Sequence, residues 1–144
     1  MRYVRGSCLA LGRQDEEVKV ATNIKIIHSQ DFIRAKPDGV LDLTTSRNLL
    51  KDLVSELDTA GKYQVLVDTR AADVILSTTD IYELGSAVAA EPALLGEKIA
   101  LLVSPEEKVN ADFFATVSQN RGAEVRAFTD FETAITWLIM KEQS

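Results

Sequence analysis

The stretch from residue 63 to residue 79, YQVLVDTRAADVILSTT, constrains the fold of this chain more than any other part of the sequence. A continuous apolar run at 65–67 is typical of a strand that is covered on both faces, as in a parallel sheet. The run ends at Asp68, and after a short loop three hydroxyl residues open a helical pattern. Strands that end in polar residues and lead into helices are where α/β proteins place binding sites. The stretch therefore predicts an α/β fold with a candidate site at this edge of the sheet.

The same alternation of strand and helix patterns continues along most of the chain. Apolar runs and period-two patterns predict strands at 24–28, 32–35, 65–67, 99–103 and 125–128. Apolar residues at helical spacing predict helices that begin near Thr44 or Thr45, Thr78, Ser104 and Asp130. We expect a single small α/β domain, with a mainly parallel sheet of four to five strands flanked by about four helices.

Two boundaries rest on local signals. Residues 1–21 lack a clear period and carry an acidic cluster at 15–17, so we expect an N-terminal extension there that could add an edge strand. The domain itself is then expected at 22–144. The sequence Pro37-Asp38-Gly39 has the chemistry of a turn, through which the first two strands could pair antiparallel.

Charge and cysteine content restrict the partners and the compartment. The chain has 144 residues and a net charge of −6, with acidic and basic residues interspersed. Nucleic acids and anionic membrane surfaces both need clustered Lys and Arg, so neither is an expected partner. No stretch approaches the ~18 apolar residues of a membrane span, so no integral membrane segment is expected. The single cysteine, Cys8, permits no intrachain disulfide and fits a reducing compartment, so we expect a cytoplasmic protein.

No catalytic, metal or cofactor motif stands out in the sequence. A Ser–His or Cys–His arrangement would have to use His28, the only histidine, which lies on an early strand, and the only cysteine, Cys8, lies in the extension. One histidine and one cysteine provide no metal-ligand spacing. The chain has neither a Gly-x-Gly-x-x-Gly motif nor a Walker-type loop for nucleotide phosphates. We therefore expect a protein that needs no cofactor and is not an enzyme.

Four segments carry a family resemblance: GVLD at 39–42, VLVDTR at 65–70, KIALLV at 98–103 and VRAFTDFETAITWL at 125–138. Together they resemble STAS domains, the family of anti-sigma-factor antagonists, and in particular the SpoIIAA-like proteins of bacteria. These proteins are related in architecture to the CRAL-TRIO lipid-binding domains. The resemblance implies a non-enzymatic regulatory or protein-interaction module, with a protein partner or a second copy of the chain. The alternative is binding of a lipid or another small apolar ligand in a CRAL-TRIO-like pocket.

The hydroxyl residues Ser77, Thr78 and Thr79 are the candidate phospho-acceptor or anion site. In phosphorylatable STAS proteins a serine opens the corresponding helix within an Asp-Ser-Ser-Gly-like motif. This chain has Leu76 in place of the aspartate and Thr79 in place of the glycine. A helix N-terminus favours a phosphate through its free N–H groups and its dipole. The other interpretation is structural, because Ser77 and Asp80 have the spacing of a capping box.

Polar residues around the same helix start form the predicted interaction surface, which consists of Asp68, Arg70, Asp80 and Tyr82. Asp68 and Arg70 follow a central strand, where binding groups of α/β proteins often lie. The alternative for this pair is a salt bridge or hydrogen bond that closes the loop.

Aromatic residues of the last two helices could line an apolar pocket, and the candidates are Phe113, Phe114 and Trp137. At helical spacing, such residues more often belong to the core. In the third helix the predicted inward stripe consists of Val109, Phe113, Phe114 and Val117. Trp137 lies off the main stripe of its own helix, which indicates a boundary position facing a partner or a ligand.

Overall fold

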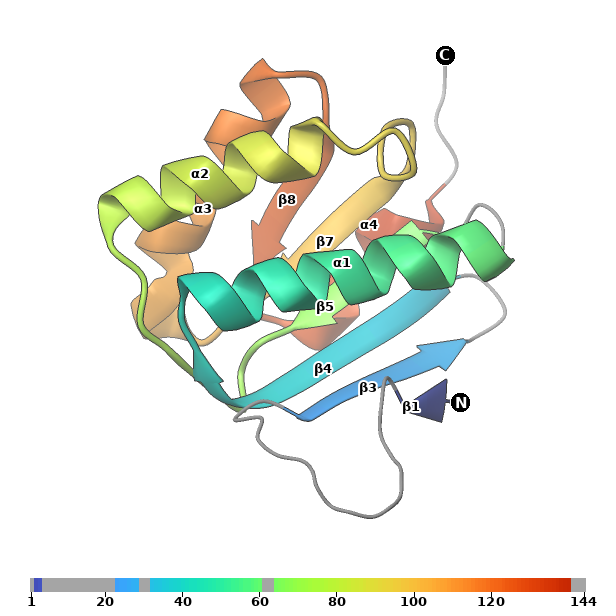
Figure 1. Ribbon diagram of the computed structural model, residues 1–144, viewed down its shortest axis with the longest axis horizontal. Helices are drawn as coiled ribbons and strands as arrows, with labels where there is room; N and C mark the ends of the chain where they lie inside the picture. The colour runs from blue at the N-terminus through green and yellow to red at the C-terminus, as the bar shows by residue number, and fades with distance from the viewer. Residues whose placement is uncertain (1, 4–22, 29–31, 61–63, 141–144) are drawn as a thin grey trace.

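The computed structural model describes residues 2–3, 23–28, 32–60 and 64–140, which form one sheet with helices on both faces (Figure 1). The strands are β1 (Arg2–Tyr3), β3 (Asn23–His28), β4 (Phe32–Leu41), β5 (Gln64–Asp68), β6 (Ala72–Val74), β7 (Lys98–Leu102) and β8 (Glu124–Phe128). The helices are α1 (Leu43–Ala60), α2 (Thr78–Ala89), α3 (Lys108–Asn120) and α4 (Phe131–Ile139), with a 3₁₀ turn, η1 (Pro105–Glu107), before α3.

The pairing of the described strands confirms the predicted α/β class with a mainly parallel sheet. Strands β4, β5, β7 and β8 run parallel in that order, and β6 pairs in the same direction with the end of β4. Strand β3 pairs antiparallel with β4, and β1 pairs antiparallel with β3. Arg2 and Tyr3 thus join the sheet, whereas Cys8 and the rest of 4–22 lie outside the described residues. The boundary at residue 21 stays a prediction.

Strand β4 continues through residues 37–39, so the predicted turn at this place is wrong. The first part of the strand, 32–35, pairs with β5, and the last part, 39–41, pairs with β6. Between these two ladders lies Pro37, which has no N–H to give to a neighbouring strand. Gly39 has a φ of 81°, a conformation that other residues rarely adopt. The turn-type residues here accompany a change of partner within one strand.

Side-chain caps begin α1, α2 and α4, although not always at the predicted residue. Asp42, and not Thr44 or Thr45, caps α1: Asp42 Oδ1 accepts the Thr45 N–H at 3.0 Å, and Thr45 Oγ1 accepts the Asp42 N–H at 2.8 Å. Asp130 caps α4 as predicted, because its Oδ2 accepts the N–H of the third helical residue at 2.8 Å. Ser104 makes no side-chain cap bond, and η1 intervenes between it and α3.

Helix α3 buries only part of its predicted apolar stripe: Val117 is buried and Phe114 packs against the upper core, as predicted. Val109 and Phe113 are exposed, and the buried positions are Ala111, Ala115, Val117 and Ser118. Helix α3 also approaches α2 closely at Gly85, where an added Cβ would lie 2.9 Å from the Val117 side chain. Small residues at a helix crossing let the two backbones approach, because the interaxial distance depends on the side chains at the contact.

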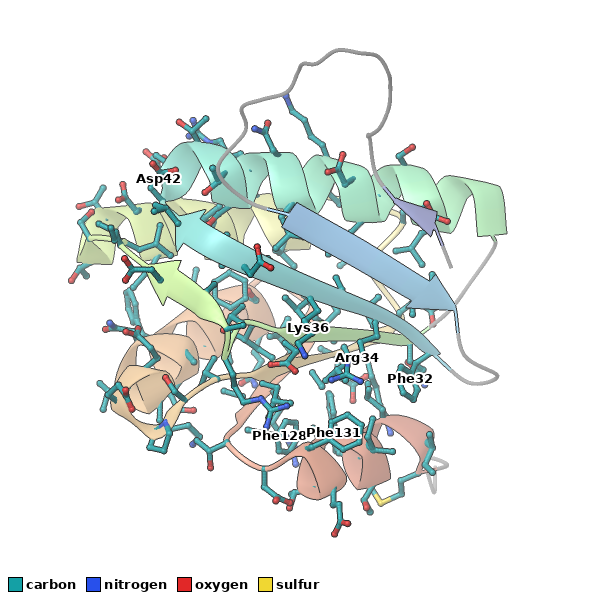
Figure 2. All side chains as sticks on the ribbon, turned by 90° about the horizontal axis from the view of Figure 1, so that it is seen from below. Phe32, Arg34, Lys36, Asp42, Phe128 and Phe131 are labelled. Atoms are coloured by element: carbon teal, nitrogen blue, oxygen red, sulfur yellow. The ribbon has the colours of Figure 1, made fainter. Side chains whose placement is uncertain are left out.

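The sheet has two differently covered faces. Helices α1, α2 and α3 pack on one, which we call the upper face, and α4 packs on the other, the lower face; Figure 2 shows α1 and α4 on opposite sides of the sheet. Because successive strand residues alternate, Val65 and Val67 of β5 point to the upper core, whereas Leu66 and Asp68 point downward. The lower core consists of Leu66, Ala100, Leu102, Phe128, Ala134, Trp137 and Leu138.

Candidate functional site

The carboxyl end of β5 holds an ion cluster made of Asp68, Arg70 and Arg34. Asp68 is completely buried, and both of its carboxylate oxygens accept hydrogen bonds from guanidinium groups. Arg70 donates through Nε and Nη2, each at 2.9 Å, and Arg34 donates through Nη2 at 3.2 Å. The Arg70 backbone N–H also donates to Asp68 Oδ1, at 3.1 Å. Asp68 and Arg70 thus form the salt bridge that is the alternative to a binding role for this pair, and Arg34 is an additional member.

Opposing effects set the pKa of Asp68. Burial acts to raise the pKa of this carboxyl, but the hydrogen bonds and charges of Arg70 and Arg34 outweigh it, so the pKa lies below its ordinary value of 3.8. The hydrogen bond to Asp68 also raises the pKa of Arg70. Asp68 is therefore an anion at neutral pH. That is the state of a structural ion pair, whereas a general acid or base needs a pKa near the working pH.

Arg34 belongs to a row of β4 side chains on the lower face, with Phe32 on one side and Lys36 on the other (Figure 2). Its guanidinium carbon lies 5.0 Å from the centroid of the Phe131 ring of α4, within the range of a cation–π contact. Sequence patterning places these three β4 residues on one face of a strand. It gives no sign of which neighbouring residue they meet, so Arg34 was not among the predicted site residues.

The predicted phospho-acceptor site forms the start of α2. Ser77 is the N-cap: its Oγ accepts the Asp80 N–H at 3.0 Å, and Asp80 Oδ2 accepts the Ser77 N–H at 3.0 Å. This is the capping box of the structural interpretation. Ser77, Thr78 and Thr79 are all exposed to solvent. Their role as a phosphate or anion site stays a prediction.

The residues of the predicted interaction surface differ in their access to solvent. Asp68 is buried, so Arg70 is the residue of this pair that is accessible to solvent. Asp80 is half-buried in the capping box, and Tyr82 is exposed on α2. Tyr82 is tied to the end of α3, because Arg121 Nη2 donates to its hydroxyl at 2.6 Å and the Arg121 guanidinium lies 5.5 Å from its ring centroid. The structure thus brings α2 and α3 together beside the predicted surface.

A cavity of about 140 Å³ lies on the upper face, between the sheet and helices α1, α2 and α3. Leu, Val and Ile side chains form most of its wall, from α1 (Leu49, Leu50 and Leu53), α2 (Ile81, Leu84 and Val88) and the strands beneath them (Val65, Val67 and Ile99). The polar or charged residues among those that line it are Ser46, Thr69, Glu107 and Asn110. Sequence patterning marks these leucines and valines as core and cannot show how completely they fill the space.

The three aromatic residues predicted to line a pocket do not come together. Phe114 lines the upper cavity, whereas its neighbour Phe113 is 37% exposed. Trp137 is buried on the opposite face of the sheet, where Lys98 Nζ lies 5.2 Å and the Arg126 guanidinium carbon 5.1 Å from its ring centroid. Trp137 belongs to the core of the lower face and also lines an open surface hollow there, with Arg126, and a role toward a partner or a ligand stays a prediction.

The described part of the chain holds neither a membrane-spanning helix nor a metal-ligand cluster. None of the helices there is long and apolar enough to cross a bilayer. No three His, Cys, Asp or Glu side chains among the described residues are grouped as metal ligands. His28 ends β3, one strand away from β1 at the edge, and Cys8 lies outside the described residues.

Comparison with solved structures identifies the fold. The chain is similar to the crystal structure of an uncharacterised DUF3478-family protein with a SpoIIAA-like fold from Shewanella loihica PV-4. The TM-score is 0.52 and the sequence identity 21%, over 86% of this chain and 99% of that one. No protein-family model matches the chain, and no curated protein does. The likeness confirms the predicted SpoIIAA-like fold and leaves function to be argued from the sites.

Proposed function

We propose that this chain is a non-enzymatic, cytoplasmic binding module of the STAS type, which regulates a protein partner through the segment 68–82. The SpoIIAA-like fold supports this by analogy. The observation that carries it is apolar exposure beside the α2 start: Ile75 is 56% and Tyr82 46% exposed. Large apolar and aromatic side chains at the surface suit burial against a protein partner, where Tyr is a frequent contact residue. Arg70 supplies a charge at the same edge.

A comparison of variants tests this surface. Ile75→Ser combined with Tyr82→Ala removes the exposed apolar side chains, and Val109→Ser, at an 80% exposed position of α3, is the matched control. Affinity purification from the host should recover the same partner with the wild type and the control, and lose it with the double variant. The partner could also be a second copy of this chain, and light scattering of the same three proteins detects that case as a change in mass. Identical partners and masses for all three would show that the segment is not the interaction surface.

Phosphorylation of Ser77, Thr78 or Thr79 would give this surface a switch. A phosphate there would meet the positive end of α2, which stabilises it, and the Asp80 carboxylate, which repels it. Mass spectrometry of the protein purified from its host should find a phosphate on the peptide that carries residues 77–79. An unmodified peptide under all growth conditions would leave a binding surface without this switch.

Binding of a small apolar ligand is the second candidate function, and the upper cavity favours it. Compact domains seldom keep a void of this size, since their interiors are close-packed. Native mass spectrometry after gentle purification should then show a protein carrying a small-molecule adduct. A bare protein that also binds no added apolar compound would contradict this candidate and leave the partner-binding proposal intact.

A further inference from the structure

The polar lining residues of the upper cavity come from one edge of the sheet. Ser46 lies in the first turn of α1, which follows β4, and Thr69 directly follows β5. Glu107 and Asn110 lie in η1 and the start of α3, which follow β7. All four therefore stand beyond the carboxyl ends of parallel strands, where α/β proteins bind ligands. Among them, Asn110 is exposed and Glu107 is half-buried, so this end of the cavity lies nearest to solvent.

We propose that this cavity binds a small amphiphile, with a compact apolar group inside and an amine or hydroxyl head beside Glu107 and Asn110. The inference rests on the apolar-ligand function proposed above, and it specifies the size and the head group of the ligand. The volume of the cavity defines the size of the ligand, and the polar residues at its edge define the head group.

The volume of the cavity limits the apolar part of the ligand. An engineered apolar cavity of about 150 Å³ stays dry and binds benzene or xenon. The present cavity, at about 140 Å³, is of the same size and has a similar aliphatic wall. A group of roughly the size of a benzene ring fills such a space. The acyl chains of a membrane lipid exceed it, so they would enter only if α1 or α2 moved away from the sheet.

The charge at the mouth selects the head group. Glu107 is the charged residue among those that line the cavity, and no Lys, Arg or His of the described chain lines it. Its side chain makes no capping bond to α3, so the carboxylate is not committed to the helix start. A carboxylate or phosphate head would be repelled by Glu107, whereas an amine or hydroxyl can donate a hydrogen bond to it. Asn110 offers a second polar partner at the same place.

Four probes that share one ring separate these properties: toluene, benzyl alcohol, benzylamine and benzoate. Ligand-observed NMR and calorimetry on the full chain should show binding of the first three and little binding of benzoate. Ala111→Phe and, independently, Val74→Phe fill the cavity from α3 and from β6, and each should abolish binding. Thr116→Phe places the same ring on the exposed face of α3 and should leave binding unchanged. Thermal unfolding of each variant shows that it is folded.

Glu107→Gln tests the head group separately. It should weaken benzylamine about fivefold, a modest factor because Glu107 is only half-buried and water screens its charge. Toluene should bind as before. If benzoate bound as tightly as benzylamine, the choice of head group would be overturned. Failure of all four probes, with a long-chain lipid bound instead, would overturn this inference and leave the apolar-ligand function standing. Failure of every apolar compound would overturn both.

Discussion

On the lower face of the sheet, charged and aromatic groups pack between α4 and the strands, beside an open surface hollow lined by Arg126, Asp130 and Trp137, whereas on the upper face three helices cover a cavity of about 140 Å³. The lower face buries Asp68 against two arginines and Trp137 against two further cations. The upper face is lined almost entirely by aliphatic side chains. The two faces are therefore held by different kinds of contact. Hydrogen bonds and cation–π contacts hold α4 in one position, whereas aliphatic packing on the upper face tolerates a cavity.

The same difference bears on where a ligand or a partner could act. A change at the carboxyl edge reaches both faces, since Thr69 lines the upper cavity and Asp68, one residue earlier, anchors the lower face. The start of α2 lies at this edge as well, and Leu76, next to the Ser77 cap, lines the cavity. The proposed ligand site and the proposed interaction surface are therefore neighbours along the chain.

The largest expected effect compares one leucine from each face. Leu138→Ala in α4 should lower the free energy of unfolding by about 4 kcal/mol, because Leu138 is completely buried in the lower core and lines neither the upper cavity nor the surface hollow. Leu53→Ala in α1 should cost only about 2 kcal/mol, since a side chain that borders a cavity already lacks contacts on one side. Urea denaturation measures both. Equal losses would mean that the two faces are packed alike.

The second prediction removes the charge at the centre of the lower face. Asp68→Asn should destabilise the fold by about 3 kcal/mol, because Arg34 and Arg70 keep their charges and lose their common partner. The value lies at the low end for a broken buried pair, since the two arginine side chains are 27% and 40% exposed. Asp73→Asn, at an exposed site in β6, is the control and should change stability by less than about 0.5 kcal/mol. A loss as small as that of the control would show that the cluster does not anchor the lower face.

Acid should weaken the lower face through the same carboxylate. The folded state lowers the pKa of Asp68 below 3.8, so its contribution to stability is complete above about pH 4 and is lost as the pH falls through the lowered pKa. Asp42 and Asp130 act in the same direction, because hydrogen bonds from Thr45 and Thr133 lower the pKa of each carboxyl. Urea denaturation from about pH 7 down to about pH 3 should show a falling free energy of unfolding, with a smaller fall in Asp68→Asn. An unchanged slope in that variant would separate Asp68 from the acid effect.

Local chemistry accounts for the features that could be predicted from the sequence. The capping box of Ser77 and Asp80 depends on a spacing of three residues, and Asp130 precedes a clear helical stripe, so both could be read from the chain. The strand and helix periods likewise gave the α/β class. What could not be predicted depends on residues far apart in the sequence. Arg34 meets Asp68 only through the register of two strands, and the close approach of α3 at Gly85 involves another helix.

The smallest expected effect asks whether the upper face is loose throughout or only at the cavity. Gly85→Ala would place a Cβ 2.9 Å from Val117 Cγ1 and 3.2 Å from the Phe114 carbonyl oxygen. Overpacking costs about 1–3 kcal/mol, and the better helix propensity of alanine returns about 1 kcal/mol, so we expect a net loss of about 1 kcal/mol. In a Val117→Ala background the same substitution should lose most of its cost, because the nearest clash is gone. A double-mutant cycle by urea denaturation measures this coupling. If Gly85→Ala costs nothing in the wild type, α2 can shift over α3, and the cavity beneath them has no fixed size.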